Sequence, residues 1–159
     1  MKILLLLTGK TDKNWIQQGI DEYFQRISKY VHFEIITVAL PKQYNSNNIP
    51  FNKIKSVEAE KQLKIIRTDD YVVVLDEHGK SCNSKDFAKF IENRTLSGNK
   101  RVVFVIGGAY GLCKTIIERS DFQLSLSAMT FSHQIVRLLF MEQLYRAFTI
   151  IKNEPYHHE

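Results

Sequence analysis

The sequence has few of the residues that mark several protein classes. Among 159 residues there are only two cysteines, Cys82 and Cys113. They form no CxxC pair and have no histidine at metal-ligand spacing, which excludes a disulfide-rich framework and a zinc finger. We therefore expect two free thiols, no metal site and a cytoplasmic location, where thiols stay reduced.

Long hydrophobic runs are also missing. No segment approaches the roughly 20 apolar residues that a membrane-spanning helix needs. The opening run, Ile3 to Leu7, is too short for the apolar part of a signal peptide, and it meets Gly9-Lys10 instead of a small-residue cleavage site. The run therefore predicts a first buried strand, and we expect no association with a membrane.

Charge of neither sign is scarce. The 22 Lys and Arg against 17 Asp and Glu give a net charge of +5, and no basic block is long enough to form a disordered arm. This balance permits nucleic-acid binding without establishing it. The length is that of one domain, over residues 1–159, with a core of its own.

Apolar runs alternate with helical patterns along the chain. Strands are predicted at 2–8, 32–38, 71–76, 101–106 and 122–126, and helices at 12–29, 53–67, 84–96 (with Ser84 as N-cap) and 132–152. The stretch 39–52, where Pro41 and Pro50 bracket polar residues, is predicted to be a loop. Strands alternating with helices predict an α/β fold, with a parallel sheet flanked by helices.

Glycines follow the fourth predicted strand directly. Its apolar run, Val102 to Ile106, ends in Gly107-Gly108, with a third glycine at Gly111. The spacing fits neither a dinucleotide fingerprint nor a P-loop, so a plain turn is one interpretation. The other is a ligand crevice, because the neighbouring strand 122–126 also opens into a loop, and open α/β sheets bind ligands at such strand ends.

The last predicted helix is apolar on more than one side. Most of its residues from Ile135 to Ile151 are aliphatic or aromatic, and such a helix must be buried on more than one side. In a domain this small, a second subunit is the simplest covering surface, which predicts a two-fold homodimer. The alternative is a central helix in the core of a monomer.

Several polar residues on this helix and after it are candidates for chemistry. His133 shares a helix face with Arg137, while Arg146 lies nine residues after Arg137, on nearly the opposite face. Because unpaired buried charge is costly, each arginine needs a destination, and a ligand loop of its own subunit and one of a partner would supply both. In the alternative, Arg146 forms only a surface ion pair with Glu142, and the tail carrying Tyr156 is a frayed terminus.

Five segments together resemble a known family. They are LDEHGK (75–80), VIGGAYG (105–111), LSLSAMTFSHQIVR (124–137), EQLYRAF (142–148) and the final PYH (155–157). In order and spacing they are similar to the small SPOUT-class methyltransferases, and most of all to the bacterial family that methylates ring nitrogen 3 of a pseudouridine in 23S ribosomal RNA. The resemblance extends over the full length.

The resemblance implies a C-terminal trefoil knot, a homodimer and S-adenosylmethionine as cofactor. The cofactor-binding residues that it implies are Leu75, Gly107, Leu126, Ser127, Ala128, Met129, Thr130 and Phe131. Close glycines and apolar walls suit such a ligand. One departure is Ser132, where the family usually has proline; serine can still cap the helix that follows.

For the reaction, the resemblance implies transfer of a sulfonium methyl group to an imide nitrogen that loses its proton. Catalysis then depends on positioning and on stabilising negative charge on the base. The candidate residues are His133, Arg137, Arg146, Tyr156 and His157. Two alternatives remain: the same pocket acting on another RNA nucleotide, and a ribosome-binding protein without activity.

Overall fold

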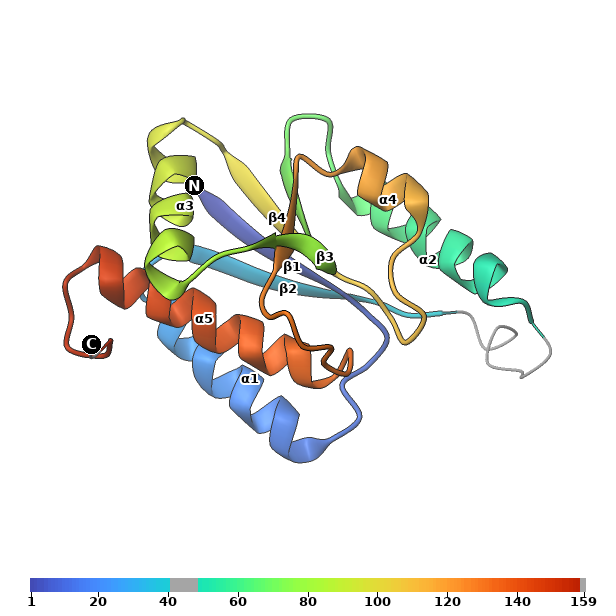
Figure 1. The fold of residues 1–159 in the computed structure, drawn as a ribbon, viewed down its shortest axis with the longest axis horizontal. Helices are drawn as coiled ribbons and strands as arrows, with labels where there is room; N and C mark the ends of the chain where they lie inside the picture. Colours follow the sequence, from blue (N-terminus) through green and yellow to red (C-terminus); the bar gives the residue numbers. More distant parts are fainter. Residues whose placement is uncertain (41–48, 158–159) are drawn as a thin grey trace.

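Five parallel strands form a single sheet in the computed structural model, which describes residues 1–40 and 49–157. Their order across the sheet is β2-β1-β4-β3-β5 (Figure 1). The strands are β1 (Lys2–Thr8), β2 (His32–Val38), β3 (Tyr71–Ser81), β4 (Arg101–Ile106) and β5 (Phe122–Ser125). All neighbouring pairs are parallel, as the alternation in the sequence predicts.

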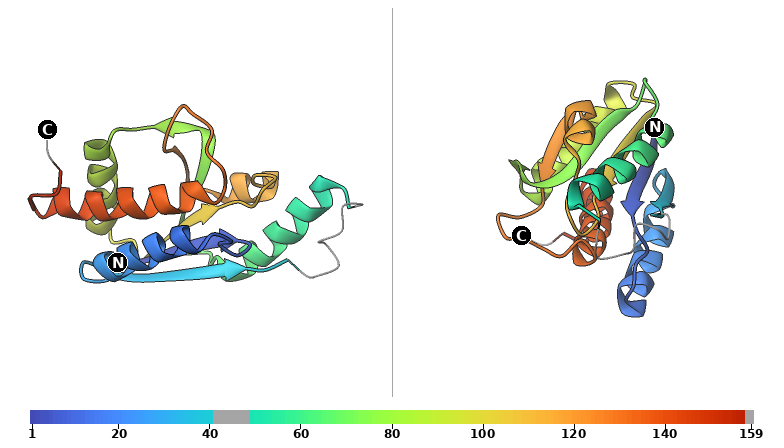
Figure 2. Two further views of the ribbon diagram at one scale, coloured as in Figure 1. Left: turned by 90° about the horizontal axis from the view of Figure 1, so that it is seen from below. Right: turned by 90° about the vertical axis from the view of Figure 1, so that its right-hand side faces the viewer.

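Helices cover both faces of the sheet. One layer holds α1 (Asn14–Ile27), α3 (Ser84–Leu96) and α5 (Ile135–Ile151), and the other holds α2 (Phe51–Ile65) and α4 (Lys114–Arg119) (Figures 1 and 2). This confirms the predicted α/β architecture. In the part of the chain that the structure describes, no helix has the length and apolar character needed to cross a bilayer.

Strand β1 shows why its sequence is a continuous apolar run. Ile3, Leu5 and Leu7 join the core under α1, α3 and α5, while Leu4 and Leu6 join the core under α2 and α4. All five side chains are buried. A strand that faces helices on both sides has no solvent-facing position, so its sequence does not alternate.

Three predicted strands have the observed bounds, and other elements differ at their ends. Helix α2 begins at Phe51, so the last two residues of the loop predicted over 39–52 belong to this helix instead. Residues 41–48 of that loop lie outside the described residues. The prediction of Ser84 as an N-cap is wrong, because Asn83 holds that position and its Oδ1 accepts from the backbone N–H of Asp86 at 2.8 Å. Helix α4 was not predicted, since six residues are too few to show a helical period.

Strand β3 is longer than predicted because it contains a bulge. Both Leu75 and Lys80 pair with Leu124 of β5, so the residues between them leave the ladder. Gly79 permits this, since a Cβ there would lie 2.7 Å from the carbonyl carbon of Gln123. The bulge therefore projects Asp76, Glu77 and His78 beyond the edge of the sheet.

Helix α5 lies between α1 and α3 of its own chain (Figure 1). The contact with α1 is close, because a Cβ on Gly19 would lie 2.7 Å from Leu138 Cδ1. These neighbours account for much of the apolar circumference of α5 within one subunit. Helix α5 is therefore a central helix of its own chain, and the homodimer stays a prediction.

A buried ion pair joins the N-terminal ends of β3 and β4. Arg101 donates from Nε to Asp70 Oδ1 at 2.7 Å and from a terminal nitrogen to Oδ2 at 2.5 Å, and the backbone N–H of Arg67 donates to Oδ2 at 2.7 Å. The Asp70 side chain is 1% exposed. Burial by itself raises the pKa of this carboxyl, but the hydrogen bonds and charge of Arg101 and the Arg67 N–H outweigh it and hold the pKa below its usual value.

We expect Asp70→Asn to lower the free energy of unfolding by about 2–4 kcal/mol at pH 7, because it leaves the Arg101 charge without its partner. Since the folded pKa is depressed, the contribution is present above the unfolded value of about 4 and is lost as the pH falls through the folded value. Urea unfolding across this range should show the variant and native proteins converging in acid. Asp69→Asn, at the exposed neighbour, is the control; a pH-independent difference for Asp70→Asn would contradict the assignment.

Candidate active site

A cavity of about 740 Å³ opens at the C-terminal ends of β3, β4 and β5. Three segments form most of its wall: the β3 bulge, the loop 107–112 after β4 and the loop 126–133 after β5. This confirms the crevice predicted between the fourth and fifth strand ends. Its place at the strand ends and its lining of glycines and apolar side chains are both typical of a ligand site.

Seven of the eight residues that the resemblance implies for cofactor binding line the cavity; Ala128 does not. Those in the wall are Leu75, Gly107, Leu126, Ser127, Met129, Thr130 and Phe131. The loop after β5 is held by its own polar groups, since Ser127 Oγ accepts from the backbone N–H of Met129 at 2.9 Å. Met129 itself is 73% exposed, at the outer lip.

The turn after β4 depends on its glycines. The backbone N–H of Gly111 donates to the carbonyl of Gly108 at 3.1 Å, and Gly111 has a φ of +76°, which favours glycine. A Cβ on Gly107 would lie 3.0 Å from the carbonyl carbon of Gly111. Gly107 therefore lets the turn fold back on itself, and a side chain there would first disturb the turn.

The β3 bulge adds residues to the site that were not predicted from the sequence. Asp76, Glu77 and His78 line the cavity, and Thr130 donates its hydroxyl to Glu77 Oε2 at 2.6 Å. This hydrogen bond joins the bulge to the loop after β5. The only signal in the sequence was the LDEHGK segment, whose polar residues after an apolar strand mark a strand end.

His133 stands at the cavity wall where α5 begins. Burial, and then the charge of Arg137, lower the pKa of its imidazole, so the ring is neutral at neutral pH. Helix α5 begins at Ile135, later than predicted, and the Ser132 hydroxyl accepts from the backbone N–H of Ile135 at 3.3 Å. Serine thus supports the helix start in place of the family's proline.

Arg137 does not line the cavity. It is fully buried, with one terminal nitrogen donating to Thr8 O and the other to Gly9 O and Thr11 Oγ1, both at 3.0 Å. Its Nε has no hydrogen-bond partner among residues 1–40 and 49–157. Arg137 therefore binds the C-terminal end of β1 and holds the start of α5 to that strand. The expectation that it faces a ligand loop is wrong.

Arg146, Tyr156 and His157 form a second cluster around Glu142. Arg146 Nε donates to Glu142 Oε1 at 3.0 Å, and the Tyr156 hydroxyl donates to the same oxygen at 3.2 Å. Arg146 also lies 3.2 Å from His157 Nδ1, and the Tyr156 hydroxyl is 3.3 Å from that of Tyr23. Burial, followed by the Tyr23 hydrogen bond, raises the pKa of Tyr156, so its hydroxyl stays protonated.

These contacts differ from the frayed terminus of the alternative interpretation. The ring of Tyr156 packs edge-on against Tyr145, with centroids 4.7 Å apart, and Tyr30 donates its hydroxyl to Glu154. The described tail residues thus rest on α1 and α5 of their own chain. His158, which follows them, lies outside the described residues.

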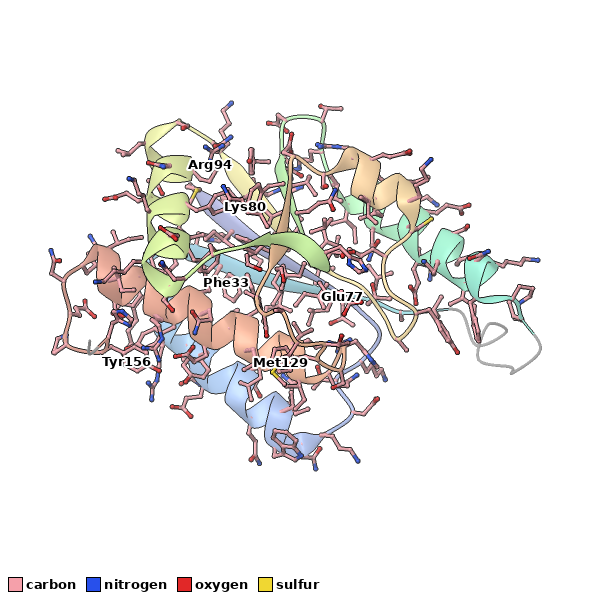
Figure 3. The ribbon with its side chains drawn as sticks, viewed as in Figure 1. Phe33, Glu77, Lys80, Arg94, Met129 and Tyr156 are labelled. Carbon is pink, nitrogen blue, oxygen red and sulfur yellow. The ribbon has the colours of Figure 1, made fainter. Side chains whose placement is uncertain are left out.

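One chain does not bring the two clusters together. The cavity lies at the start of α5 and the Arg146 cluster along its second half and the tail, as Met129 and Tyr156 show in Figure 3. Arg146 follows the first residue of α5, Ile135, by 11 residues, which is about 16 Å along the helix axis. A site that uses both clusters would need a second copy of the chain.

The described residues offer no set of ligands for a metal ion. Within 1–40 and 49–157 there is no group of three or more His, Cys, Asp or Glu that could hold an ion. Cys82 and Cys113 are both free, as predicted from their spacing.

Comparison with known proteins identifies the family. The family model described as "Predicted SPOUT methyltransferase" matches residues 1–157, which is nearly the whole chain. The chain belongs to the SPOUT methyltransferase family. The cavity between its strand-end loops is therefore the candidate active site of a SPOUT methyltransferase.

Relatives of this SPOUT chain are similar over their full lengths. A protein of Christiangramia forsetii named "Ribosomal RNA large subunit methyltransferase H" is 48% identical over 158 residues, covering 99% of each chain. A protein of the same name from Flavobacterium johnsoniae is 44% identical over 159 residues, covering 100% of each. The resemblance noted in the sequence is thus confirmed at the level of the family.

Solved structures of low sequence identity share the SPOUT fold. A probable methyltransferase from Bordetella pertussis Tohama I superposes with a TM-score of 0.54 at 14% identity, covering 92% of this chain and 95% of that one. A tRNA (m1G37) methyltransferase from Aquifex aeolicus gives 0.51 at 14% identity, covering 100% and 76%. The trefoil knot that the fold implies stays a prediction here.

We expect Arg137→Met to lower the free energy of unfolding by about 2–4 kcal/mol, because it leaves the buried acceptors on Thr8, Gly9 and Thr11 without donors. Chemical unfolding at fixed protein concentration measures this. Lys114→Met, at a side chain that is 86% exposed, should change the value by less than about 0.5 kcal/mol. A variant of native stability that fails to catalyse would instead place Arg137 directly in the reaction.

Proposed function

We propose that this SPOUT methyltransferase transfers a methyl group from S-adenosylmethionine to ring nitrogen 3 of a pseudouridine in 23S ribosomal RNA. The observation that carries the proposal is the full-length similarity to proteins named ribosomal RNA large subunit methyltransferase H. The choice of pseudouridine and of nitrogen 3 rests on the family resemblance of the quoted segments. A ribosomal RNA substrate agrees with the expected cytoplasmic location.

The cavity fits the proposed cofactor. Leu75, Leu112, Leu126 and Phe131 offer apolar walls for an adenine ring, and the turn at Gly107 brings backbone groups to the surface of the cavity. When bound, S-adenosylmethionine supplies an electrophilic methyl group on a sulfonium sulfur. The chain supplies the positioning of the two reactants.

The remaining residues stabilise the charge that develops on the base. The imide nitrogen loses its proton to solvent, and negative charge develops on the neighbouring carbonyl oxygens. The guanidinium of Arg146 and the protonated hydroxyl of Tyr156 can hold that charge, since both point into one cluster with His157. The neutral ring of His133 stands at the cavity wall and can take part in holding the base.

A homodimer with antiparallel α5 helices completes the proposed site. In that arrangement the start of α5 in one subunit lies beside the end of α5 in its partner. The Arg146 cluster of one subunit then faces the cavity of the other, whereas within one chain the two are held apart along α5. The proposed site therefore requires a homodimer, in which the outward residues of α5 form the contact between the two subunits.

Mapping of modified nucleotides tests the reaction. Deletion of the gene should remove one methyl group from a single pseudouridine of 23S ribosomal RNA, and the intact gene should restore it, as read by mass spectrometry of RNA fragments. Loss of methylation at another nucleotide would keep the enzyme class and change the substrate. Unchanged ribosomal RNA, with a protein that binds no cofactor, would indicate a ribosome-binding protein without activity.

Complementation between subunits tests the composite site. Homodimers carrying Gly107→Val, or both Tyr156→Ala and His157→Ala, should each methylate ribosomes at least a hundredfold more slowly than the native protein. A heterodimer of the two variants, purified through two different tags, contains one undamaged site. It should recover up to half of the native rate.

A heterodimer as inactive as its parents, or a protein that light scattering shows to be monomeric at micromolar concentration, would refute the composite site. The native protein and the tail variant should bind the cofactor equally well, since the tail lies away from the cavity.

A further inference from the structure

Glu58 of α2 is a buried carboxylate without a partner. It is 5% exposed, and within the described part of the chain it has no hydrogen bond and no ion pair. Burial raises its pKa to about 7, and the charge of Lys55 offsets this only in part. A charged carboxylate in such a position is costly, so Glu58 is a candidate for a role at the site.

The carboxylate does not itself line the cavity, but it lies against Gly108, which does. Its Oε1 is 2.8 Å, and its Oε2 3.3 Å, from the point where a Cβ on Gly108 would stand. Thr8 Cγ2 is 3.3 Å from the same point, and Gln62 donates its amide N–H to Thr8 Oγ1 at 2.7 Å. Gly108 and Lys55 both line the cavity, so Glu58 stands directly behind its wall, separated by a residue without a side chain.

The two carboxylates in the cavity wall are already engaged. Asp76 Oδ1 accepts from the backbone N–H of His78 at 2.8 Å, and Glu77 accepts from the Thr130 hydroxyl at 2.6 Å. Glu58 differs from both, because neither of its two oxygens accepts a hydrogen bond from the described residues. Its complement is a positively charged group that enters the cavity beside Gly108.

We propose that Glu58 binds the positively charged methionine end of S-adenosylmethionine and thereby selects a cationic ligand. The inference rests on the proposed function, which supplies the cofactor. That end carries two positive charges, one on the α-ammonium group and one on the sulfonium sulfur, and either can pair with a carboxylate. The absence of a side chain at Gly108 is what lets either of them approach the carboxylate.

Calorimetric titration of three ligands tests this at pH 8, above the raised pKa of Glu58. S-adenosylmethionine carries both charges, S-adenosylhomocysteine only the ammonium group, and 5′-methylthioadenosine neither. Glu58→Gln, which keeps the shape of the side chain, should weaken S-adenosylmethionine at least tenfold, about 1.4 kcal/mol. It should leave 5′-methylthioadenosine unchanged.

The affinity for S-adenosylhomocysteine identifies which of the two charges Glu58 binds. An equal loss for S-adenosylhomocysteine assigns the ammonium group, and an unchanged affinity for it assigns the sulfonium. The control Glu60→Gln changes an exposed carboxylate on the same helix and should leave all three affinities as they are. Thermal unfolding without ligand should show Glu58→Gln to be no less stable than the native protein, because it removes a buried charge.

Gly108→Ala provides an independent perturbation. The added methyl would meet the flexible end of Glu58 at 2.8 Å and push it aside, so the fold should survive. The variant should lower S-adenosylmethionine affinity, and combining it with Glu58→Gln should add little further loss.

Unchanged S-adenosylmethionine affinity in Glu58→Gln, or an equal loss for 5′-methylthioadenosine, would overturn the inference. In either case native binding of 5′-methylthioadenosine and native methylation of ribosomes would leave the proposed function standing. Failure of the native protein to bind any of the three ligands would instead refute the proposed cofactor.

Discussion

Burial of the sheet on both faces is the constraint on which the rest of the structure depends. With α1, α3 and α5 on one side and α2 and α4 on the other, the central strands β1 and β4 are apolar and buried along almost their whole length. In the middle of the sheet, polar groups can therefore meet a ligand only where the strands end. The chain uses both edges: at the N-terminal ends Asp70 and Arg101 join β3 to β4, and at the C-terminal ends the loops enclose the cavity.

Helix α5 connects this sheet to both groups of candidate residues. Its buried Arg137 holds the helix to the end of β1, and its apolar face packs between α1 and α3. Because the helix is fastened in this way, the His133 end and the Arg146 end keep a fixed separation. Neither end can approach the other by bending of a loop.

Much of the fold could be predicted because it depends on local pattern. The run Val102 to Ile106 and the glycines after it specify a buried strand and a tight turn by their own chemistry. The features that sequence reasoning missed depend on contacts through space. Glu58 looks like any charged helix residue until Gly108 is placed against it, and the destination of Arg137 lies over a hundred residues away in the chain.

Fixing two clusters on one helix also restricts how the chain can change over evolution. Each residue turns an α-helix by about 100°. Inserting or deleting a single residue between Arg137 and Arg146 would rotate one cluster a quarter turn or more away from the other while leaving both locally intact. The number of residues in this part of α5 should therefore stay constant, even where individual side chains are exchanged for others of similar size.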